Sequence, residues 1–146
     1  MNETEWLQSL LDRCFELADA AGRRGDTPVG SLVAAADGEI IAEASERNRT
    51  HDIFAHAELM AIQAAIRTAQ SSNLIGLTLV TTKEPCFLCS YAIRQARISR
   101  VIFAIRNAET GGYSSRFPIL TADNIESWGS APEIINTAEL LPPNAK

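Results

Sequence analysis

The sequence predicts an α/β fold in which one mixed β-sheet is covered by helices on its faces. Apolar residues with helical spacing alternate with short β-branched segments, in the order helix, strand, strand, helix, strand, helix, strand, short helix, strand. The length of 146 residues is typical of one domain. The hydrophobic share of 46% and the charged share of 21% are close to globular averages, which excludes a fibrous or fully disordered chain. We therefore predict a single domain over residues 1–146.

The first three elements form a helix followed by a hairpin. Apolar residues recur at helical spacing over 5–21, directly after Thr4, which is a suitable N-cap. Residues 29–35 form an apolar run of strand length, and residues 39–44 have the length of a returning strand. Asp37-Gly38 stands between the two runs and is a strong hairpin signal. We expect an antiparallel pair of strands here.

The middle of the chain contains a loop and three further elements. Residues 45–55 are polar without periodicity, which predicts a loop. Helical spacing returns over 56–69, and residues 77–82 are rich in β-branched side chains, as expected of a strand. A helix over 85–96 follows, because the proline at its first position suits a first helical turn.

The C-terminal third carries weaker signals. Residues 101–105 predict a fourth strand, and a glycine-containing loop around 110–112 follows it. We expect a short helix near 120–128 and a short strand near 133–136. The proline-containing tail over 141–146 is expected to fray.

Charge and cysteine content narrow the functional classes. The chain has 13 Lys+Arg against 18 Asp+Glu, a net charge of −5, which argues against a polyanion as its main partner, although an acidic total leaves room for one local basic patch. No apolar run approaches the ~20 residues of a membrane helix, and the acidic N-terminus lacks the basic region of a secretory signal. Three cysteines, an odd number, argue against a disulfide framework and favour the reducing cytoplasm.

Two short motifs contain the residues with metal chemistry. His56-Ala57-Glu58 opens one predicted helix, and Pro85-Cys86-Phe87-Leu88-Cys89 opens the next. One imidazole and two thiolates are ligands that zinc prefers, and cysteines three residues apart share one helical face. A helix N-terminus also favours the thiolate form, because it is the positive end of the helix dipole. The sequence predicts a Zn²⁺ site built from His56, Cys86 and Cys89.

Glu58 is the predicted acid–base residue of this site. Three protein ligands leave the fourth tetrahedral position for water, which is typical of a catalytic zinc site. Zinc lowers the pKa of a bound water to about 7. Glu58 stands two residues from His56, so its carboxylate can lie beside that water and carry a proton to a leaving nitrogen.

Two other interpretations of the same residues stay open. A Cys-x-x-Cys pair is also typical of thiol redox sites, which would oxidise reversibly without a bound metal. A non-catalytic zinc-stabilised domain would keep the three ligands but would have no use for the carboxylate of Glu58. The two motifs together favour catalytic zinc over either alternative.

The combined pattern His-x-Glu and Pro-Cys-x-x-Cys resembles the cytidine deaminase superfamily. With a histidine as the first ligand, the chain resembles one branch of this superfamily, which contains the guanine, cytosine and tRNA adenosine deaminases. The resemblance runs from Thr27-Pro28-Val29-Gly30 to Gly111, and it includes Asp52, Thr82-Lys83-Glu84-Pro85 and residues 97–103. It implies a three-layer αβα cytidine-deaminase-like fold with a five-stranded mixed sheet, and a homodimer or larger homo-oligomer. It also implies the same zinc ligands and the same proton shuttle.

Substrate contacts are expected from the resemblance at five positions: Glu46, Asn48, Phe54, Ala57 and Pro85. The family usually holds the substrate ring with an asparagine just after the second strand. Asn48 is the nearest asparagine, whereas Glu46 lies closer to the expected place and would accept hydrogen bonds from a ring N–H or an amino group. Phe54 would either stack on a heterocycle or pack within the protein. Backbone groups at Ala57 and Pro85 are expected to hold the exocyclic group.

These features predict a zinc-dependent aminohydrolase that deaminates a small amino-substituted heterocycle by zinc-bound hydroxide, with release of ammonia. Guanine, or another free base, nucleoside or analogue in base salvage, is the expected substrate. The tRNA-acting relatives continue into a basic helix beyond the equivalent of residues 133–141, so with the charge of −5 nucleic acid is not expected as a partner. The alternative is a tRNA adenosine-to-inosine deaminase, and the alternative of another class is a non-catalytic zinc-stabilised domain.

Overall fold

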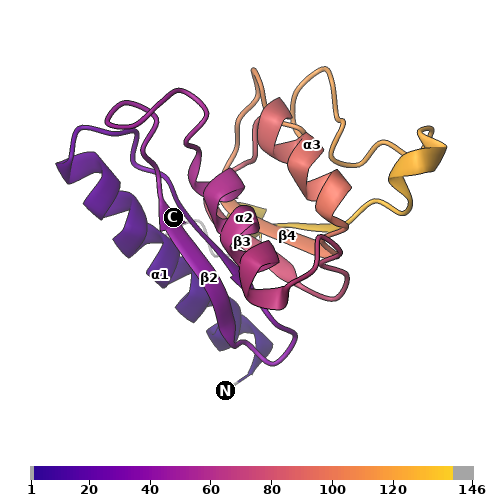
Figure 1. Cartoon of the computed structure of the whole chain (residues 1–146), viewed down its shortest axis with the longest axis horizontal. Coiled ribbons are helices and arrows are strands. Elements are labelled where there is room, and N and C mark those ends of the chain that lie inside the picture. Colours follow the sequence, from indigo (N-terminus) through magenta and orange to yellow (C-terminus); the bar gives the residue numbers. More distant parts are fainter. Residues whose placement is uncertain (1, 140–146) are drawn as a thin grey trace.

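The computed structural model describes residues 2–139 (Figure 1). Its helices and strands follow the chain as α1 (Glu3–Arg23), β1 (Gly30–Ala34), β2 (Ile40–Ser45), α2 (Ala57–Ala69), β3 (Thr78–Lys83), α3 (Phe87–Ala96), β4 (Arg100–Ile105), the 3-10 turn η1 (Glu126–Trp128), β5 (Glu133–Asn136) and the 3-10 turn η2 (Thr137–Glu139). The strands within this range form one sheet in the order β2-β1-β3-β4-β5. Strand β1 pairs antiparallel with β2 and β3, whereas β3, β4 and β5 are parallel. The predicted five-stranded mixed sheet is therefore confirmed.

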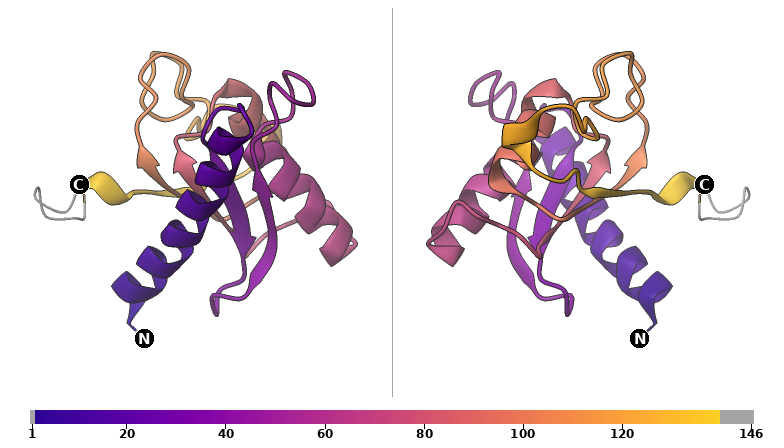
Figure 2. Two further views of the ribbon diagram at one scale, coloured as in Figure 1. Left: turned by 90° about the vertical axis from the view of Figure 1, so that its left-hand side faces the viewer. Right: turned by 90° about the vertical axis from the view of Figure 1, so that its right-hand side faces the viewer.

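Helices cover both faces of the sheet, because neighbouring strand residues point to opposite sides. Leu32, Val80 and Ile102 pack under the apolar stripe of α1, whose inward residues are Leu7, Leu10, Leu11 and Cys14. The adjacent residues Val33, Leu79 and Val101 point the other way and pack with α2 and α3. Figure 2 shows α1 and α2 on opposite sides of the sheet. This three-layer αβα arrangement is the predicted one.

The expected helix near 120–128 is wrong, since only residues 126–128 are helical. The buried guanidinium of Arg94 explains the difference. Its Nη1 donates to the carbonyl oxygens of Ile119 (3.1 Å), Leu120 (3.3 Å) and Ala122 (2.8 Å), and its Nη2 donates to that of Gly129 (3.2 Å). Carbonyls that point at one side chain cannot form the i to i−4 bonds of a helix.

The starts of two helices differ from the expected ones. Helix α1 begins at Glu3, and its N-cap is Asn2 and not the expected Thr4, because the Asn2 side chain accepts a hydrogen bond from the N–H of Glu5 (2.9 Å). Helix α3 begins at Phe87, because Cys86 is its N-cap with extended backbone (φ −71°, ψ 179°). The predicted tail over 141–146 lies outside the described residues. Within residues 2–139, none of the helices combines the length and apolar character that crossing a bilayer requires.

Candidate active site

The two sequence motifs meet at one edge of the sheet. Strands β2 and β3 run in the same direction, because each is antiparallel to β1 between them. Their C-terminal ends therefore lie at the same edge, where β2 leads into the loop before α2 and β3 leads into α3. His56 is the N-cap of α2, Cys86 is the N-cap of α3, and Cys89 lies in the first turn of α3.

His56, Cys86 and Cys89 form a compact ligand set. The Nδ1 atom of His56 lies 3.4 Å from the sulfur of Cys86 and 3.5 Å from that of Cys89, and all three ligand atoms lie within 4.8 Å of one another. Zinc bonds of about 2.0 Å to nitrogen and 2.3 Å to sulfur place tetrahedral ligand atoms roughly 3.6–3.8 Å apart. The donor types and their spacing therefore fit a zinc ion.

The three ligand groups shift one another's pKa values. A hydrogen bond from the Cys89 thiol lowers the pKa of Cys86 to about 4. Burial acts in the opposite direction, and a hydrogen bond from His56 lowers the pKa further. The thiolate of Cys86 in turn raises the pKa of His56 to about 9. The pKa of Cys89 is raised because its proton is held by Cys86 and because it is buried. A metal bound here would displace these protons.

Glu58 lies beside the ligands in the buried first turn of α2. Its Oε1 accepts a hydrogen bond from the Thr81 hydroxyl (2.9 Å), which itself accepts one from the Ser31 hydroxyl (2.7 Å). Its Oε2 lies 3.3 Å from the sulfur of Cys89. Burial raises the pKa of Glu58, so the carboxyl group holds a proton more readily than an exposed one.

Ser31 and Thr81 are functional residues that the sequence analysis missed. They are cross-strand partners on β1 and β3, both fully buried, and they fix the orientation of the Glu58 carboxyl group. The sequence contains one indication of this role, which is a hydroxyl side chain at a buried position of an apolar strand. Buried polar side chains need hydrogen-bond partners.

A cavity of about 240 Å³ opens in front of the ligand set. It is lined by Thr27, Val29, Glu46, Asn48, His56, Glu58, Lys83, Glu84, Cys86, Asn107 and Thr110. This volume is below the ~300–1,000 Å³ of pockets for drug-sized ligands, and it suits a single flat ring.

Glu46 and Asn48, the two expected ring contacts, both line this cavity. Glu46 is buried, and its Oε1 accepts a hydrogen bond from the backbone N–H of Ala57 (2.6 Å) at the positive end of α2. Burial raises the pKa of Glu46 to about 7. Asn48 is oriented by Thr27, because its Oδ1 accepts from the Thr27 N–H (3.1 Å) and its Nδ2 donates to the Thr27 hydroxyl (2.9 Å).

The other three expected substrate contacts are not among the lining residues. The N–H of Ala57 is donated to Glu46, and the carbonyl of Pro85 accepts from the N–H of Gly112 (2.9 Å). Phe54 is 61% exposed on the loop before His56. The substrate contacts of these three residues stay predictions.

Glu84 is a further residue to which the sequence analysis assigned no role. It is 2% exposed and follows β3 directly before the cysteine motif. Its carboxylate accepts hydrogen bonds from the backbone N–H groups of Asn107 (3.3 Å), Tyr113 (3.0 Å) and Ser114 (2.8 Å). A Cβ atom on Gly111 would lie 1.8 Å from this carboxylate, so only glycine fits there. Glu84 thereby holds the 107–114 loop against the cavity.

Replacing Glu84 with alanine is expected to lower the free energy of unfolding by about 2–4 kcal/mol. Three part-buried N–H groups lose their acceptor, which costs about 1–3 kcal/mol for a fully buried group, and water replaces part of that loss. Urea unfolding measures the change. The exposed Glu109 of the same loop provides the control, since Glu109→Ala is expected to stay within about 0.5 kcal/mol of wild type. Equal stabilities of the two variants would contradict this role of Glu84.

The chain is similar to known proteins in family, sequence and structure. The family described as "Cytidine and deoxycytidylate deaminase zinc-binding region" matches residues 4–105. A tRNA-specific adenosine deaminase of Aquifex aeolicus is 40% identical over 128 residues, which cover 85% of this chain and 83% of the relative. A structure from work on A-to-I editing by tRNA:A34 deaminases superposes with a TM-score of 0.80 at 28% identity, covering 88% of this chain and 97% of the other. Guanine deaminase from Bacillus subtilis gives a TM-score of 0.65 at 34% identity, with 73% and 66% covered.

Proposed function

Because the chain belongs to the zinc-binding cytidine and deoxycytidylate deaminase family and is a zinc-dependent hydrolytic deaminase, we propose that it converts adenosine to inosine in tRNA. The observation that carries this proposal is the 40% identity to a tRNA-specific adenosine deaminase over most of both chains. The higher TM-score and coverage of the tRNA deaminase structure, relative to guanine deaminase, point in the same direction. In this proposal residues 1–146 act as one catalytic domain.

The expectation of a free nucleobase as substrate is wrong, and so is the expectation that nucleic acid is no partner. Both are overturned by the tRNA-specific adenosine deaminases among the relatives and by the tRNA deaminase structure. The expectation rested on the basic C-terminal helix of the tRNA-acting relatives and on the net charge of −5, which averages over the whole surface and does not describe the charge around the site. A specific role as guanine deaminase in base salvage is likewise not supported.

His56, Cys86 and Cys89 would hold the zinc ion in this proposal. When bound, zinc supplies Lewis acidity that makes water a nucleophile near neutral pH. Glu58 takes one proton of the attacking water at its carboxylate and delivers it to the adenine ring nitrogen. It then takes the second proton from the hydroxyl now on the ring carbon and delivers it to the departing amine, which leaves as ammonia. Thr81 keeps the carboxylate aimed at the reacting atoms, since its hydroxyl fixes Oε1. The products are inosine and ammonia.

Glu46 and Asn48 would hold the adenine ring. The Oε2 of Glu46 has no hydrogen-bond partner in the described part of the chain. It is not among the buried polar atoms that lack a partner there, so it is accessible from the cavity. It can accept a hydrogen bond from the 6-amino group, the one exocyclic donor of adenine. The Nδ2 of Asn48 retains a second N–H after bonding Thr27 and can donate to a ring nitrogen.

The cellular setting is part of the proposal. The three cysteines Cys14, Cys86 and Cys89 are all free thiols, which suits the reducing cytoplasm where tRNA is found. The homodimer or larger oligomer implied by the family resemblance stays a prediction.

The proposed function is tested by incubating zinc-loaded protein with an RNA hairpin that carries adenosine in its loop, and in parallel with free guanine, cytosine and adenosine. Inosine in the RNA, with little turnover of the free compounds, is the expected result. Ammonia from guanine together with unchanged RNA would overturn the proposal. The same hairpin without loop adenosine is the matched control.

A further inference from the structure

Basic residues are concentrated on the loops that border the cavity in an otherwise acidic protein. Two loops border the cavity, because Asn48 from residues 46–55 and Asn107 and Thr110 from residues 105–117 line it. The basic residues on and beside these loops are Arg47, Arg49, Lys83, Arg106 and Arg116. The exposed acidic residues on the same loops are Asp52 and Glu109. Among the exposed side chains of the two loops, cations therefore outnumber carboxylates, although the cavity lining contains Glu46, Glu58 and Glu84 and the chain carries −5.

These cations are largely free to contact a ligand. Arg47, Arg49, Lys83 and Arg116 form no side-chain hydrogen bond or ion pair with other residues in the described range 2–139, and Arg106 bonds only the hydroxyl of Ser114 (3.2 Å). All of them except the half-buried Lys83 are exposed. Free arginines attract phosphate groups.

Exposed apolar side chains stand among the cations. Phe54 and Phe117 are each 61% exposed, Ile53 is 71% exposed and Tyr113 is 39% exposed, all on the same two loops. Phe54 has no aromatic partner within the described residues, whereas Phe117 contacts Phe87 edge to face at 6.0 Å. Aromatic rings interleaved with arginines are typical of surfaces that bind single-stranded nucleic acid, where bases stack and phosphates pair with cations.

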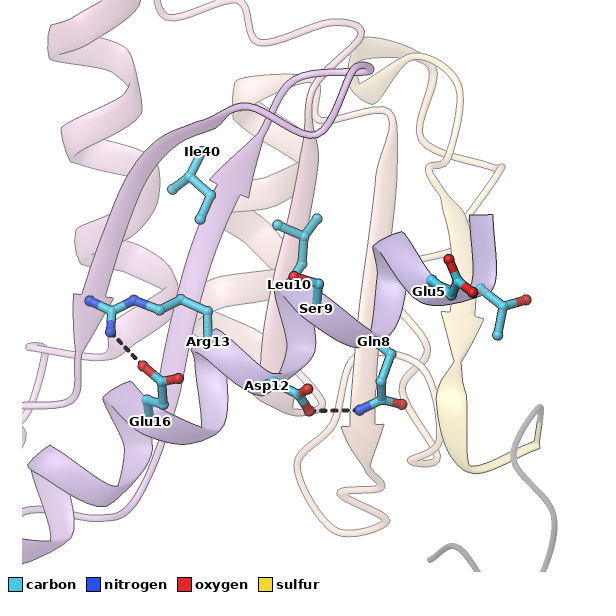
Figure 3. Close-up of a pocket in the computed structure, with 9 residues that line it drawn as sticks. Glu5, Gln8, Ser9, Leu10, Asp12, Arg13, Glu16 and Ile40 are labelled. Atoms are coloured by element: carbon cyan, nitrogen blue, oxygen red, sulfur yellow. Dashed lines mark hydrogen bonds and ion pairs between the residues drawn. The ribbon is translucent and has the colours of Figure 1, made fainter. Parts of the chain in front are cut away.

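The side of the molecule that carries α1 is acidic. A surface hollow of about 710 Å³ lies along α1, and Glu5, Asp12 and Glu16 are among the residues that line it (Figure 3). The one cation there, Arg13, is paired with Glu16 (2.8 Å) and with Glu43 of β2. A polyanion would be repelled from this face and directed to the mouth of the cavity.

We propose that residues 47–54, residues 105–117 and Lys83, together called the rim, bind the single-stranded loop of an RNA whose target adenosine enters the cavity. This inference rests on the proposed function and adds the surface that holds the substrate. Arg47 and Arg49 contact phosphates on one side of the cavity, and Arg106 and Arg116 contact them on the other. Phe54 stacks on a base next to the target.

The test measures binding of an RNA hairpin with a loop adenosine as a function of salt, for wild type and for two rim variants. In Arg47→Gln/Arg49→Gln, the slope of log K against log salt should fall by about 1.4, since each phosphate contact on a single strand contributes about 0.7. In Phe54→Ala, affinity should fall about 5- to 100-fold through loss of one stacked base. The control Arg13→Gln/Arg67→Gln removes the same charge away from the rim and should bind RNA as wild type does.

Turnover separates failure of the rim from failure of the proposed function. At saturating RNA the Arg47→Gln/Arg49→Gln variant should keep the wild-type kcat while its KM rises, because neither arginine touches the reacting atoms. Wild-type affinity and salt slope in both rim variants, with RNA still deaminated, would overturn the rim and leave the function standing. A wild-type protein that neither binds nor deaminates the hairpin would overturn the function itself.

A change of oligomeric state in the rim variants, with RNA affinity unchanged, would identify the rim as a contact between copies of the chain. That result would also overturn the proposal.

Discussion

Replacing Glu58 with glutamine is expected to lower kcat by about 10²–10⁴-fold while zinc stays bound, because an amide cannot take or return the proton that general acid–base catalysis requires. Glutamine has the size of glutamate and can still accept the hydrogen bond from Thr81, so the fold of the site is retained. Inosine formation in the RNA hairpin and zinc content per chain measure the two parts of this prediction.

The control for this variant is Glu39→Gln. Glu39 is exposed on the hairpin between β1 and β2, at the opposite edge of the sheet from the cavity, and its substitution should leave kcat unchanged. Substantial turnover by the Glu58 variant would remove this carboxylate from the mechanism. Loss of zinc in the same variant would instead assign Glu58 to the metal site.

Replacing Cys89 with alanine is expected to lower zinc affinity by at least about 10²-fold and to abolish deamination. Loss of residues that merely orient metal ligands already costs about 10–100-fold, and loss of a ligand removes a bond outright. Cys89 is fully buried next to His56 and Glu58. In the Cys89→Ala variant, no solvent-exposed side chain of the described residues can therefore take the place of the sulfur as a metal ligand. Metal analysis after dialysis against a weak chelator gives the zinc content.

Cys14 provides a matched control, because it is also a buried free thiol but lies on α1, on the other face of the sheet. Its sulfur donates to the carbonyl of Val80 (3.3 Å) and does not belong to the group of ligand atoms at the site. Cys14→Ala should keep about one zinc per chain. Equal zinc content in the Cys14 and Cys89 variants would mean that Cys89 is not a ligand.

The sequence predicted the regular elements well where one face of the element is buried. Leu7, Leu10, Leu11 and Cys14 repeat at helical spacing because all four reach the same sheet face, so the helix is visible in the pattern. The segment over 120–128 has no such face. Its backbone follows Arg94, a residue about 30 positions earlier, and local periodicity contains no information about that contact.

The residues of the candidate site also differ in whether the sequence predicts them. His56, Glu58, Cys86 and Cys89 were predictable because each pair lies within one helical turn, and a short motif therefore records their relative positions. Ser31, Thr81 and Glu84 were not, because their partners lie on other strands or loops at distances of 23 to 50 residues along the chain.

The sequence by itself therefore predicted a mixed sheet covered by helices, the three zinc-type ligands and a candidate acid–base carboxylate, since all depend on local periodicity and short spacing. The tertiary structure alone decided which hydroxyls orient Glu58, that Glu46 bonds the start of α2, and that two distant loops with basic and aromatic residues border one cavity. Net charge is a sum over all residues, whereas binding depends on where the charges lie. Chain folding sets those positions by bringing residues 47–54 and 105–117 to the same edge of the sheet.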